Sequence, residues 1–393
     1  MRVLYVAPYV PSRLRPRPFN LLRELIRRGH EVTAAVLSVN RGDDAALEDL
    51  INLSLTPFVI HANRAKAVAR AALSVAGSEP LDVAYCNCPD LRRIVRSLVA
   101  EGRFDVLHFE HLRVAGVGLQ FRDVPRLFDS VDCMSALWES AARLEGGRSG
   151  AVARLQVGRV RRYEKALLPE FDAVTVSSRA DAVALSTLAP SVRPDLVPNG
   201  VDADYFGQTQ WQPQGDRVLF WGRLQYHANA HAVVDFCRTL WPRIRAERPN
   251  ATLSIIGASP PRHVWALGEA PGITVTGFVR DLRPYLAQAS VAICPVTVGA
   301  GTQFKALEAL AAGVPLVATR RVIESLDLKN GTEALSAEDP KALCQAVLAL
   351  LKNPELGRLM HKHGKDRVRR DFTWEAATNT IESAYERIVQ RKQ

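Results

Sequence analysis

Residues 291–319 read Val-Ala-Ile-Cys-Pro-Val-Thr-Val-Gly-Ala-Gly-Thr-Gln-Phe-Lys-Ala-Leu-Glu-Ala-Leu-Ala-Ala-Gly-Val-Pro-Leu-Val-Ala-Thr, and they carry most of the information about the fold. The apolar run at 291–295 predicts a short buried strand, and Gly299 and Gly301 predict a turn. The run that stops at Gly313 predicts a helix. A strand, a glycine-bearing turn and a helix N-terminus together form an anion site, because unpaired amides and the helix dipole point at the same place.

The helix predicted over 303–312 carries a cation and a carboxylate among apolar residues. Gly301, Lys305 and Glu308 lie at positions i, i+4 and i+7, which places them on one face of that helix. This face lies beside the anion site, so Lys305 and Glu308 are candidates for ligand binding. The alternative interpretation is a Lys305–Glu308 ion pair on the surface.

Strand and helix patterns alternate along the chain in two halves. Apolar runs typical of buried strands lie at 2–7, 32–39, 104–109, 125–131, 172–177, 217–221, 252–256, 273–276, 291–295 and 316–319. Helix patterns between them include 18–28, 229–247, 281–288 and 303–312. Such alternation predicts parallel sheets covered by helices on both faces. We therefore expect an α/β protein with two Rossmann-like, doubly wound domains.

The join between the two domains is predicted at 197–216, a polar stretch that contains Val197-Pro-Asn-Gly-Val-Asp202 and further Pro and Gly residues. We expect an N-terminal domain at 1–196 and a C-terminal domain at 217–372. Residues 373–393 place apolar side chains at helical spacing, which predicts a long amphipathic helix that must dock on another part of the protein.

Length and composition also restrict the class of protein. A chain of 393 residues suits two domains. Because no run of 18 apolar residues occurs and the chain starts directly with a strand-like run, we expect no secretory signal, no membrane-spanning helix and a cytoplasmic location. The formal net charge of +10 rests on arginine, which supplies 42 of the 51 basic residues, and no basic tail is present.

Two local clusters of basic residues stand out. Arg13, Arg15 and Arg17 lie in one loop, and a second cluster lies on the helix predicted around 154–165. Arginine suits phosphate because its planar fork binds two oxygens at once. Either cluster is a candidate for contact with an anionic substrate or an anionic membrane surface, and the alternative is an ordinary solvated face.

Four motifs occur in an order that is typical of one enzyme class. They are Val197-Pro-Asn-Gly-Val-Asp202, Gly222-Arg223-Leu224 after a strand, the turn Gly277-Phe-Val-x-Asp281, and the strand–turn–helix at 291–319. In these motifs the chain resembles GT-B-fold retaining glycosyltransferases of family 4 (glycosyl transferases group 1). Within that family it is most similar to a bacterial branch of sugar transferases associated with exopolysaccharide or PEP-CTERM systems.

The resemblance covers nearly the whole chain and implies an architecture and a division of labour. It implies two Rossmann-like domains that face a cleft, with a nucleotide-sugar donor on the C-terminal domain and the acceptor on the N-terminal domain. It also implies that the last helix crosses back to the N-terminal domain.

The resemblance assigns donor-side residues by position. Arg223 matches the arginine that holds the donor diphosphate, and Glu308 matches the second glutamate of a Glu-x7-Glu motif, which binds the ribose hydroxyls. The first glutamate is replaced by Ala300, and the usual lysine partner of Arg223 would fall near Asn229. Lys305 is placed to supply the missing charge. The further donor-binding candidates are Gly222, Phe278, Val279, Gly299, Gly301, Thr302, Gln303 and Asn229.

In the N-terminal half, Asp105-Val-Leu-His108-Phe-Glu110-His111 resembles the strand end from which the family projects a histidine toward the acceptor. Glu110 stands where the family commonly has its second histidine, so His108, Glu110 and His111 are all catalytic candidates.

The other acceptor-side candidates come from a loop and from the next strand. Asp129 and Asp132 close that strand, and Arg13, Arg15 and Arg17 supply positive charge. The alternative for the two aspartates is a structural role, with Asp132 or Ser135 capping the following helix.

Sugar transfer builds positive charge at the anomeric carbon and negative charge on the leaving diphosphate. Arg223, Lys305 and the helix N-terminus near Gly301 offer positive charge without a metal ion, and no Asp-x-Asp pair occurs. We therefore expect a metal-independent reaction without a cofactor, and the resemblance implies retention of configuration.

The predicted function is that of a hexosyl- or related glycosyltransferase (EC 2.4 class) in polysaccharide or glycoconjugate biosynthesis. Its partners would be a nucleoside-diphosphate sugar and a hydroxyl acceptor. The sugar, the base and the acceptor stay open. A lipid-linked acceptor would bring the protein to the cytoplasmic face of the inner membrane.

Other functions fit fewer of these features. A GT-B-fold nucleotide-sugar epimerase or hydrolase and a non-catalytic nucleotide-sugar or glycan-binding partner stay open because of Ala300 and Asn229. A nicotinamide dehydrogenase is disfavoured because the first strand–helix turn, Ala7-Pro-Tyr-Val-Pro-Ser12, lacks a Gly-x-Gly-x-x-Gly pattern. Nucleic-acid binding would rest on the basic charge alone. His227 and His231 have the spacing of a zinc pair but no third ligand.

Overall fold

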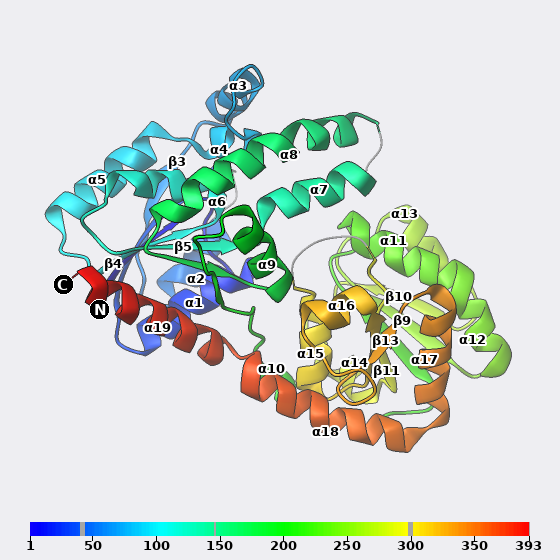
Figure 1. The fold of residues 1–393 in the computed structure, drawn as a ribbon. Coiled ribbons are helices and arrows are strands. Elements are labelled where there is room, and N and C mark those ends of the chain that lie inside the picture. Colours follow the sequence, from blue (N-terminus) through cyan, green and yellow to red (C-terminus); the bar gives the residue numbers. More distant parts are fainter. Residues whose placement is uncertain (40–43, 145–146, 298–301, 393) are drawn as a thin grey trace. The chain divides into compact units, whose positions relative to one another are not determined.

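The computed structural model describes residues 1–39, 44–144, 147–297 and 302–392. Gly299, Ala300 and Gly301, which the sequence places in the anion-binding turn, lie outside the described residues. The chain divides into two compact units. Unit 1 is Met1–Asn199 together with the chain from Trp374 onward, and unit 2 is Gly200–Thr373 (Figure 1).

Unit 1 contains a seven-stranded sheet in the order β3-β2-β1-β4-β5-β6-β7, and the paired strands are parallel. Its strands are β1 (Arg2–Ala7), β2 (Glu31–Ser38), β3 (Phe58–His61), β4 (Val106–Glu110), β5 (Arg126–Val131), β6 (Ala173–Val176) and β7 (Asp195–Leu196). Its helices are α1 (Pro16–Arg27), α2 (Asp44–Ile51), α3 (Arg64–Ser74), α4 (Leu81–Cys86), α5 (Pro89–Glu101), α6 (Leu112–Ala115), α7 (Met134–Leu144), α8 (Gly147–Leu167), α9 (Arg179–Leu188) and α19 (Trp374–Lys392).

Unit 2 contains a six-stranded sheet in the order β10-β9-β8-β11-β12-β13, again with parallel pairings. Its strands are β8 (Arg217–Trp221), β9 (Thr252–Ile256), β10 (Ile273–Gly277), β11 (Val291–Cys294), β12 (Leu316–Thr319) and β13 (Leu335–Ala337). Its helices are α10 (Ala203–Gly207), α11 (His227–Asp235), α12 (Trp241–Glu247), α13 (Arg262–Trp265), α14 (Arg283–Gln288), α15 (Phe304–Ala312), α16 (Arg320–Ser325), α17 (Pro340–Lys352) and α18 (Pro354–Asp371).

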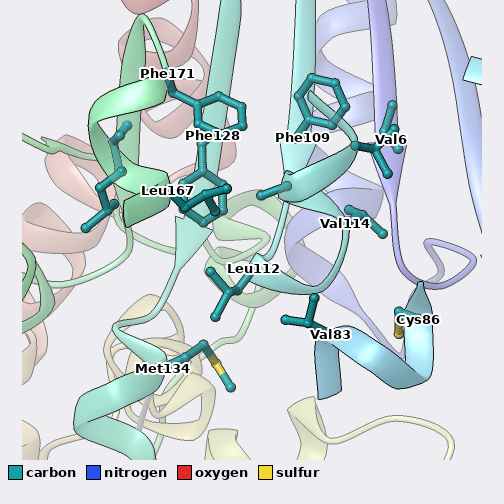
Figure 2. Packing of buried hydrophobic residues seen from close by; sticks show 14 of the residues in the cluster. Val6, Val83, Cys86, Phe109, Leu112, Val114, Phe128, Met134, Leu167 and Phe171 are labelled. Carbon is teal, nitrogen blue, oxygen red and sulfur yellow. The ribbon is translucent and has the colours of Figure 1, made fainter. Parts of the chain in front are cut away.

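Each sheet is buried on both faces, as the near-continuous apolar strands require. In β1, Leu4 and Val6 pack into one hydrophobic cluster, whereas Tyr5 and Ala7 pack into another. Figure 2 shows part of the first cluster, in which the ring of Phe171 lies near those of Phe109 and Phe128. The predicted pair of doubly wound α/β domains is confirmed.

The last helix, α19, belongs to unit 1, although its sequence follows unit 2. It packs against α1, where Arg27 pairs with Glu375 at 2.6 Å and Arg28 pairs with Glu382. The hydroxyl of Tyr385 lies 2.7 Å from Nδ1 of His108 on β4. The predicted return of the C-terminal helix to the N-terminal domain is therefore confirmed.

The sequence missed three strands, β3, β7 and β13. All three lie at or near a sheet edge and are short, with four, two and three residues, so they lack a long apolar run. The single helix expected at 229–247 contains a π-helical turn over Phe236–Leu240, between α11 and α12. Within the described residues, no helix combines the length and apolarity needed to cross a membrane.

Candidate functional site

In unit 2, two glycines allow the ends of neighbouring strands to come close together. The chain leaves β8 at Gly222 with φ +150°. A Cβ atom added to Gly257, just after β9, would lie 2.0 Å from the carbonyl oxygen of Gly222. A Cβ atom at Gly222 would approach Nδ2 of Asn229 at 3.0 Å and Cε of Lys305 at 3.3 Å. Glycine at both positions thus brings the backbone close to the side chains of α11 and α15.

Lys305, near the start of α15, is buried with 7% of its surface exposed. Its Nζ donates hydrogen bonds to Oδ1 of Asn229 at 2.8 Å and to Oε1 of Gln303 at 3.2 Å. Nδ2 of Asn229 in turn donates to the carbonyl of Arg223 at 3.1 Å. The ammonium therefore lies beside position 229, near which the resemblance expects a lysine. The Lys305–Glu308 surface pair is wrong, because Lys305 is buried against α11.

Glu308 lies one turn further along α15 and contacts the end of β8. Its Oε2 accepts a hydrogen bond of 2.6 Å from Nε1 of Trp221. Burial raises the pKa of Glu308, and the Trp221 hydrogen bond and the Lys305 ammonium oppose this rise. Among the described residues, no group donates to the other carboxylate oxygen, which leaves it free for a ligand hydroxyl. The contact of Trp221 is not predicted from the sequence. Its position directly before the Gly222-Arg223-Leu224 motif is the feature that could have indicated it.

The remaining donor candidates are distributed around this centre. Arg223 is exposed, and its guanidinium makes no hydrogen bond or ion pair within the described parts of the chain. Phe278, just after β10, is 72% exposed, whereas Val279 is partly buried against a hydrophobic cluster. Gln303 is the N-cap residue of α15, and Thr302 precedes it. These positions follow the carboxyl ends of β8, β10 and β11, where ligands bind in open α/β sheets.

In unit 1, Glu110 at the end of β4 is fully buried between two tyrosines. Oε2 accepts from the hydroxyl of Tyr5 at 2.9 Å, and Oε1 accepts from the hydroxyl of Tyr9 at 2.7 Å. Burial and the nearby Asp129 carboxylate raise the pKa of Glu110 to about 7, against the effect of these hydrogen bonds. Glu110 therefore keeps its proton to a higher pH than an ordinary glutamate does.

His108 is directed at α19. Burial lowers its pKa to about 4, so the imidazole is neutral near pH 7. A proton on Nε2 fits the geometry, because Nδ1 then accepts from the hydroxyl of Tyr385 while Nε2 lies 4.0 Å from Oδ2 of Asp129. These contacts connect His108 to α19 and to Asp129, and its catalytic role stays a prediction.

His111 follows β4 with φ +72°, a conformation that is uncommon outside glycine. Its Nδ1 accepts a hydrogen bond of 3.3 Å from the backbone N–H of Arg113. Burial, followed by the Arg113 charge, lowers the pKa of His111 to about 3. It is therefore a neutral imidazole at the carboxyl edge of the sheet.

Arg17 and Asp129 form a buried ion pair. Nε and Nη2 of Arg17 each donate to one carboxylate oxygen of Asp129 at 2.9 Å, and Nη1 donates to the carbonyl of Val197 at 2.9 Å. Burial alone would raise the pKa of Asp129, but the Arg17 guanidinium holds that pKa below its usual range. The charges of Arg17 and Asp129 therefore satisfy each other, and their acceptor-side role stays a prediction.

The capping alternative for Asp132 and Ser135 is also wrong. The carboxylate of Glu164, on α8, accepts from the backbone N–H groups of Met134 at 2.7 Å and Ser135 at 3.0 Å, and so caps α7. Asp132 accepts a hydrogen bond from the Ser177 hydroxyl at 3.3 Å. Burial, with a contribution from Asp181, raises the pKa of Asp132 to about 6.

The other two arginines of the loop before α1 have different surroundings. Arg13 is exposed and pairs with Asp49 at 3.2 Å. Arg15 lies over the ring of Tyr9, 4.6 Å from its centroid, and lines a pocket together with Arg113. In unit 2, the rings of His227 and His231 lie 6.4 Å apart, and the described residues contain no group of three side chains arranged to hold a metal ion.

Comparison with known proteins identifies the class. Residues 19–205 match the family model described as Glycosyltransferase Family 4, and residues 215–353 match the one described as Glycosyl transferases group 1. The two matches together span most of the chain. The chain is therefore a glycosyltransferase with a GT-B fold.

Particular relatives agree with this class. The chain is 27% identical to glycogen synthase of Mycobacterium tuberculosis over 305 residues. This alignment covers 72% of the present chain and 69% of the glycogen synthase. Sucrose-phosphate synthase from Thermosynechococcus elongatus has the same fold, with a TM-score of 0.70 at 17% identity over the full length of both chains. The Anabaena protein HepE, solved in complex with UDP, aligns with a TM-score of 0.69 at 13% identity over 98% of this chain and 100% of that one.

Proposed function

We propose that this glycosyltransferase moves a sugar from a nucleoside-diphosphate sugar to a hydroxyl acceptor, with retention of configuration and without a metal ion. The observation that carries the proposal is the arrangement in which Asn229 links the buried Lys305 ammonium to the backbone of Arg223. It concentrates positive charge near the end of β8, where a diphosphate needs it.

Each residue has a role in this proposal. Arg223 and Lys305 stabilise the negative charge that develops on the leaving diphosphate, and their positive charge stands in for a divalent cation. Glu308, oriented by Trp221, accepts hydrogen bonds from the ribose hydroxyls. HepE, whose structure contains UDP, gives independent support for a nucleoside diphosphate on this fold.

Retention rests on the family resemblance, and the contacts of two carboxylates of unit 1 bear on how it would be achieved. Glu110 is engaged by two tyrosines, and Asp129 is engaged by Arg17. Neither is placed as a free nucleophile. The donor phosphate would then remove the acceptor proton on the face that the leaving group vacates, which gives retention without a covalent intermediate on the protein.

We also propose the biological setting. The enzyme would act in the cytoplasm, in polysaccharide or glycoconjugate biosynthesis. If its acceptor is lipid-linked, it would act at the cytoplasmic face of the inner membrane.

The first test is the thermal stability of the protein with UDP, GDP, TDP, ADP or NAD, each with Mg²⁺ and with EDTA. A ligand that binds only the folded protein raises the melting temperature. We expect one nucleoside diphosphate to raise it equally in both conditions. No shift with any diphosphate, or a shift that requires Mg²⁺, would contradict the proposal.

The second test follows the sugar itself. Nucleoside-diphosphate sugars that carry the base of the stabilising diphosphate are incubated with extracts that contain acceptors. NMR of the product then gives the configuration at the anomeric carbon. Transfer with retention is expected. Release of free sugar as the sole product would indicate a hydrolase, and binding without turnover would indicate a non-catalytic partner.

A further inference from the structure

A pocket of about 310 Å³ opens in unit 1 and shares no residue with the donor candidates of unit 2. It lies where β1 and β2 end, and α4 and α6 contribute to its walls. Its polar lining consists of Tyr9, Arg15, Asp82, Tyr85 and Arg113. The two guanidinium groups and one carboxylate give the pocket an excess of positive charge.

The side chain of Arg113 is the informative feature of this pocket. Its Nε is buried and has no hydrogen-bond partner among the described residues. No described carboxylate forms an ion pair with its guanidinium either. A buried charged donor without a partner is costly, so such groups are normally paired. An anion in the pocket would supply the missing partner.

Neighbouring contacts hold this part of the pocket in place. The backbone N–H of Arg113 is fixed by His111, whose positive φ turns the chain directly after β4. Arg15 is held over the ring of Tyr9 and donates from Nη1 to the carbonyl of Val10 at 2.8 Å. The hydroxyl of Tyr9 is bound to the buried Glu110. One wall of the pocket is therefore preorganised by the core of unit 1.

The chemistry of the lining defines a class of ligand. The planar guanidinium group of arginine donates two hydrogen bonds at once to a phosphate or a carboxylate. The Asp82 carboxylate, which has no hydrogen-bond or ion-pair partner in the described part of the chain, is suited to accept from a hydroxyl group. The rings of Tyr9 and Tyr85 offer apolar faces for a carbon skeleton. The expected ligand therefore has a phosphate or a carboxylate, hydroxyl groups and a carbon skeleton. A phosphorylated or carboxylated sugar combines these features.

We propose that this pocket binds the anionic group of the acceptor, with Arg113 as its main ligand and Arg15 as the second. This inference rests on the proposed sugar transfer and adds that the acceptor carries a phosphate or a carboxylate. The anion would position the acceptor, and the pocket would discriminate against neutral sugars.

The test uses the full-length protein, its R113Q variant and calorimetric titration with inorganic phosphate, glucose 6-phosphate, glucuronate and the neutral methyl glucoside. We expect at least one anionic probe to bind the wild type and methyl glucoside not to bind. Loss of charge-assisted hydrogen bonds should weaken the bound probe by about tenfold or more in R113Q. R113K should lie between the two, because it keeps the charge but loses the fork.

Two controls separate recognition from folding. R103Q removes an exposed arginine that precedes β4, at the amino ends of the strands and away from the pocket at their carboxyl ends. This variant should bind the probes as the wild type does. R15Q tests the pocket independently if R113Q fails to fold. Failure of every anionic probe to bind, or equal binding by wild type, R113Q and R15Q, would overturn the proposal.

A further experiment distinguishes a lipid-linked anion from a soluble one. Phosphatidylcholine vesicles with and without phosphatidic acid are compared with soluble glucose 6-phosphate. Arg113-dependent binding in either case upholds recognition of an anion and assigns it to a lipid-linked or a free acceptor. Stabilisation by UDP is measured in parallel: if UDP binds but no anion does, this inference alone fails, whereas absence of any diphosphate effect overturns the proposed function.

Discussion

In the proposed donor site, the Lys305 ammonium of α15 would take the place of a lysine that the resemblance expects on another helix. The resemblance expects a lysine on the helix after Arg223, but that position holds Asn229. The Lys305 ammonium of α15 lies beside this position and donates a hydrogen bond of 2.8 Å to Oδ1 of Asn229. The spacing within 291–319 is enough to single out Lys305, because a cation on a largely apolar helix is costly to bury unless it has a partner or a ligand.

Arg223→Ala should lower kcat/KM for the nucleotide-sugar donor by roughly 10- to 100-fold, because charge-assisted hydrogen bonds to the diphosphate are lost. Steady-state kinetics with the preferred donor measure this. Arg238→Ala is the matched control, since Arg238 is also exposed and lies on a helix of the same unit. Unchanged kinetics in Arg223→Ala would remove Arg223 from the donor site.

Glu308→Ala should weaken binding of the nucleoside diphosphate by about tenfold or more, since the ribose loses its acceptor. Isothermal titration with the diphosphate measures the affinity. Glu269→Ala, an exposed glutamate of unit 2, should leave the affinity unchanged. Equal affinities in wild type and Glu308→Ala would show that the ribose binds elsewhere.

Glu110 should make stability depend on pH. The pKa of an unfolded glutamate is about 4.3, and the folded value is about 7. Between these values the folded state binds more protons than the unfolded state, so the free energy of unfolding falls as pH rises, by at most about 1.4 kcal/mol per pH unit. The stabilising effect is fully present below pH of about 4.3 and is lost as pH rises through about 7.

The measurement compares urea unfolding of the wild type and Glu110→Gln from pH 5 to pH 8. His108, His111 and Asp132 titrate differently from their unfolded forms in both proteins, so the difference between the two curves isolates Glu110. A difference that stays constant with pH would mean that Glu110 does not titrate in this range.

The roles of residues are harder to predict from sequence than their positions. Arg17 and Asp129 are polar groups at the carboxyl edge of a sheet, but they pair with each other across 112 positions of sequence. No local pattern signals that partnership. The sequence gives no sign of Arg113 either, because a single arginine in a short helix carries no motif, and its unpaired Nε is visible only in three dimensions.

At the scale of elements, alternation of apolar runs predicts the strands at the centre of each sheet, since these are buried on both faces. Strands such as β8 and β9 agree with their predicted bounds. The edge strand β3 is not predicted, because Phe58 is 47% exposed and the element has four residues. The apolar spacing of α19 predicts a docked helix, and the family resemblance implies where it docks.

Tyr385→Phe tests how α19 is held. The change removes the hydroxyl that contacts His108 and leaves a buried ring nitrogen without a partner, which should cost about 1–3 kcal/mol of stability. Chemical denaturation measures the loss, while affinity for the diphosphate should stay constant because the proposed donor site lies in unit 2. Tyr226→Phe, at a half-exposed tyrosine, should change stability by less than about 0.5 kcal/mol. Equal stabilities of the two variants would contradict the role of Tyr385.

At the scale of the whole molecule, the two units differ in continuity. Unit 2 is a single segment, Gly200–Thr373, with its own sheet and hydrophobic clusters. Unit 1 needs two segments that are separated by all of unit 2. The sequence boundaries near 197 and 373 are indicated by turn chemistry and by the amphipathic spacing that begins there.

A fragment of residues 200–373 should therefore fold alone, with cooperative thermal unfolding by circular dichroism and binding of the diphosphate. A fragment of residues 1–199 should gain cooperative unfolding only when a peptide of residues 374–393 is added. Cooperative melting of the 1–199 fragment without the peptide would show that α19 is dispensable for unit 1.

The place of α19 in the sequence also has a consequence for synthesis. A domain at the start of a chain usually folds while the rest is still being translated. Here unit 1 must wait for α19, because the residues that cover His108 and flank α1 are translated only after all of unit 2. Unit 2 can finish folding first, and the apolar side chains of unit 1 that pack against α19 would stay uncovered until α19 has been translated.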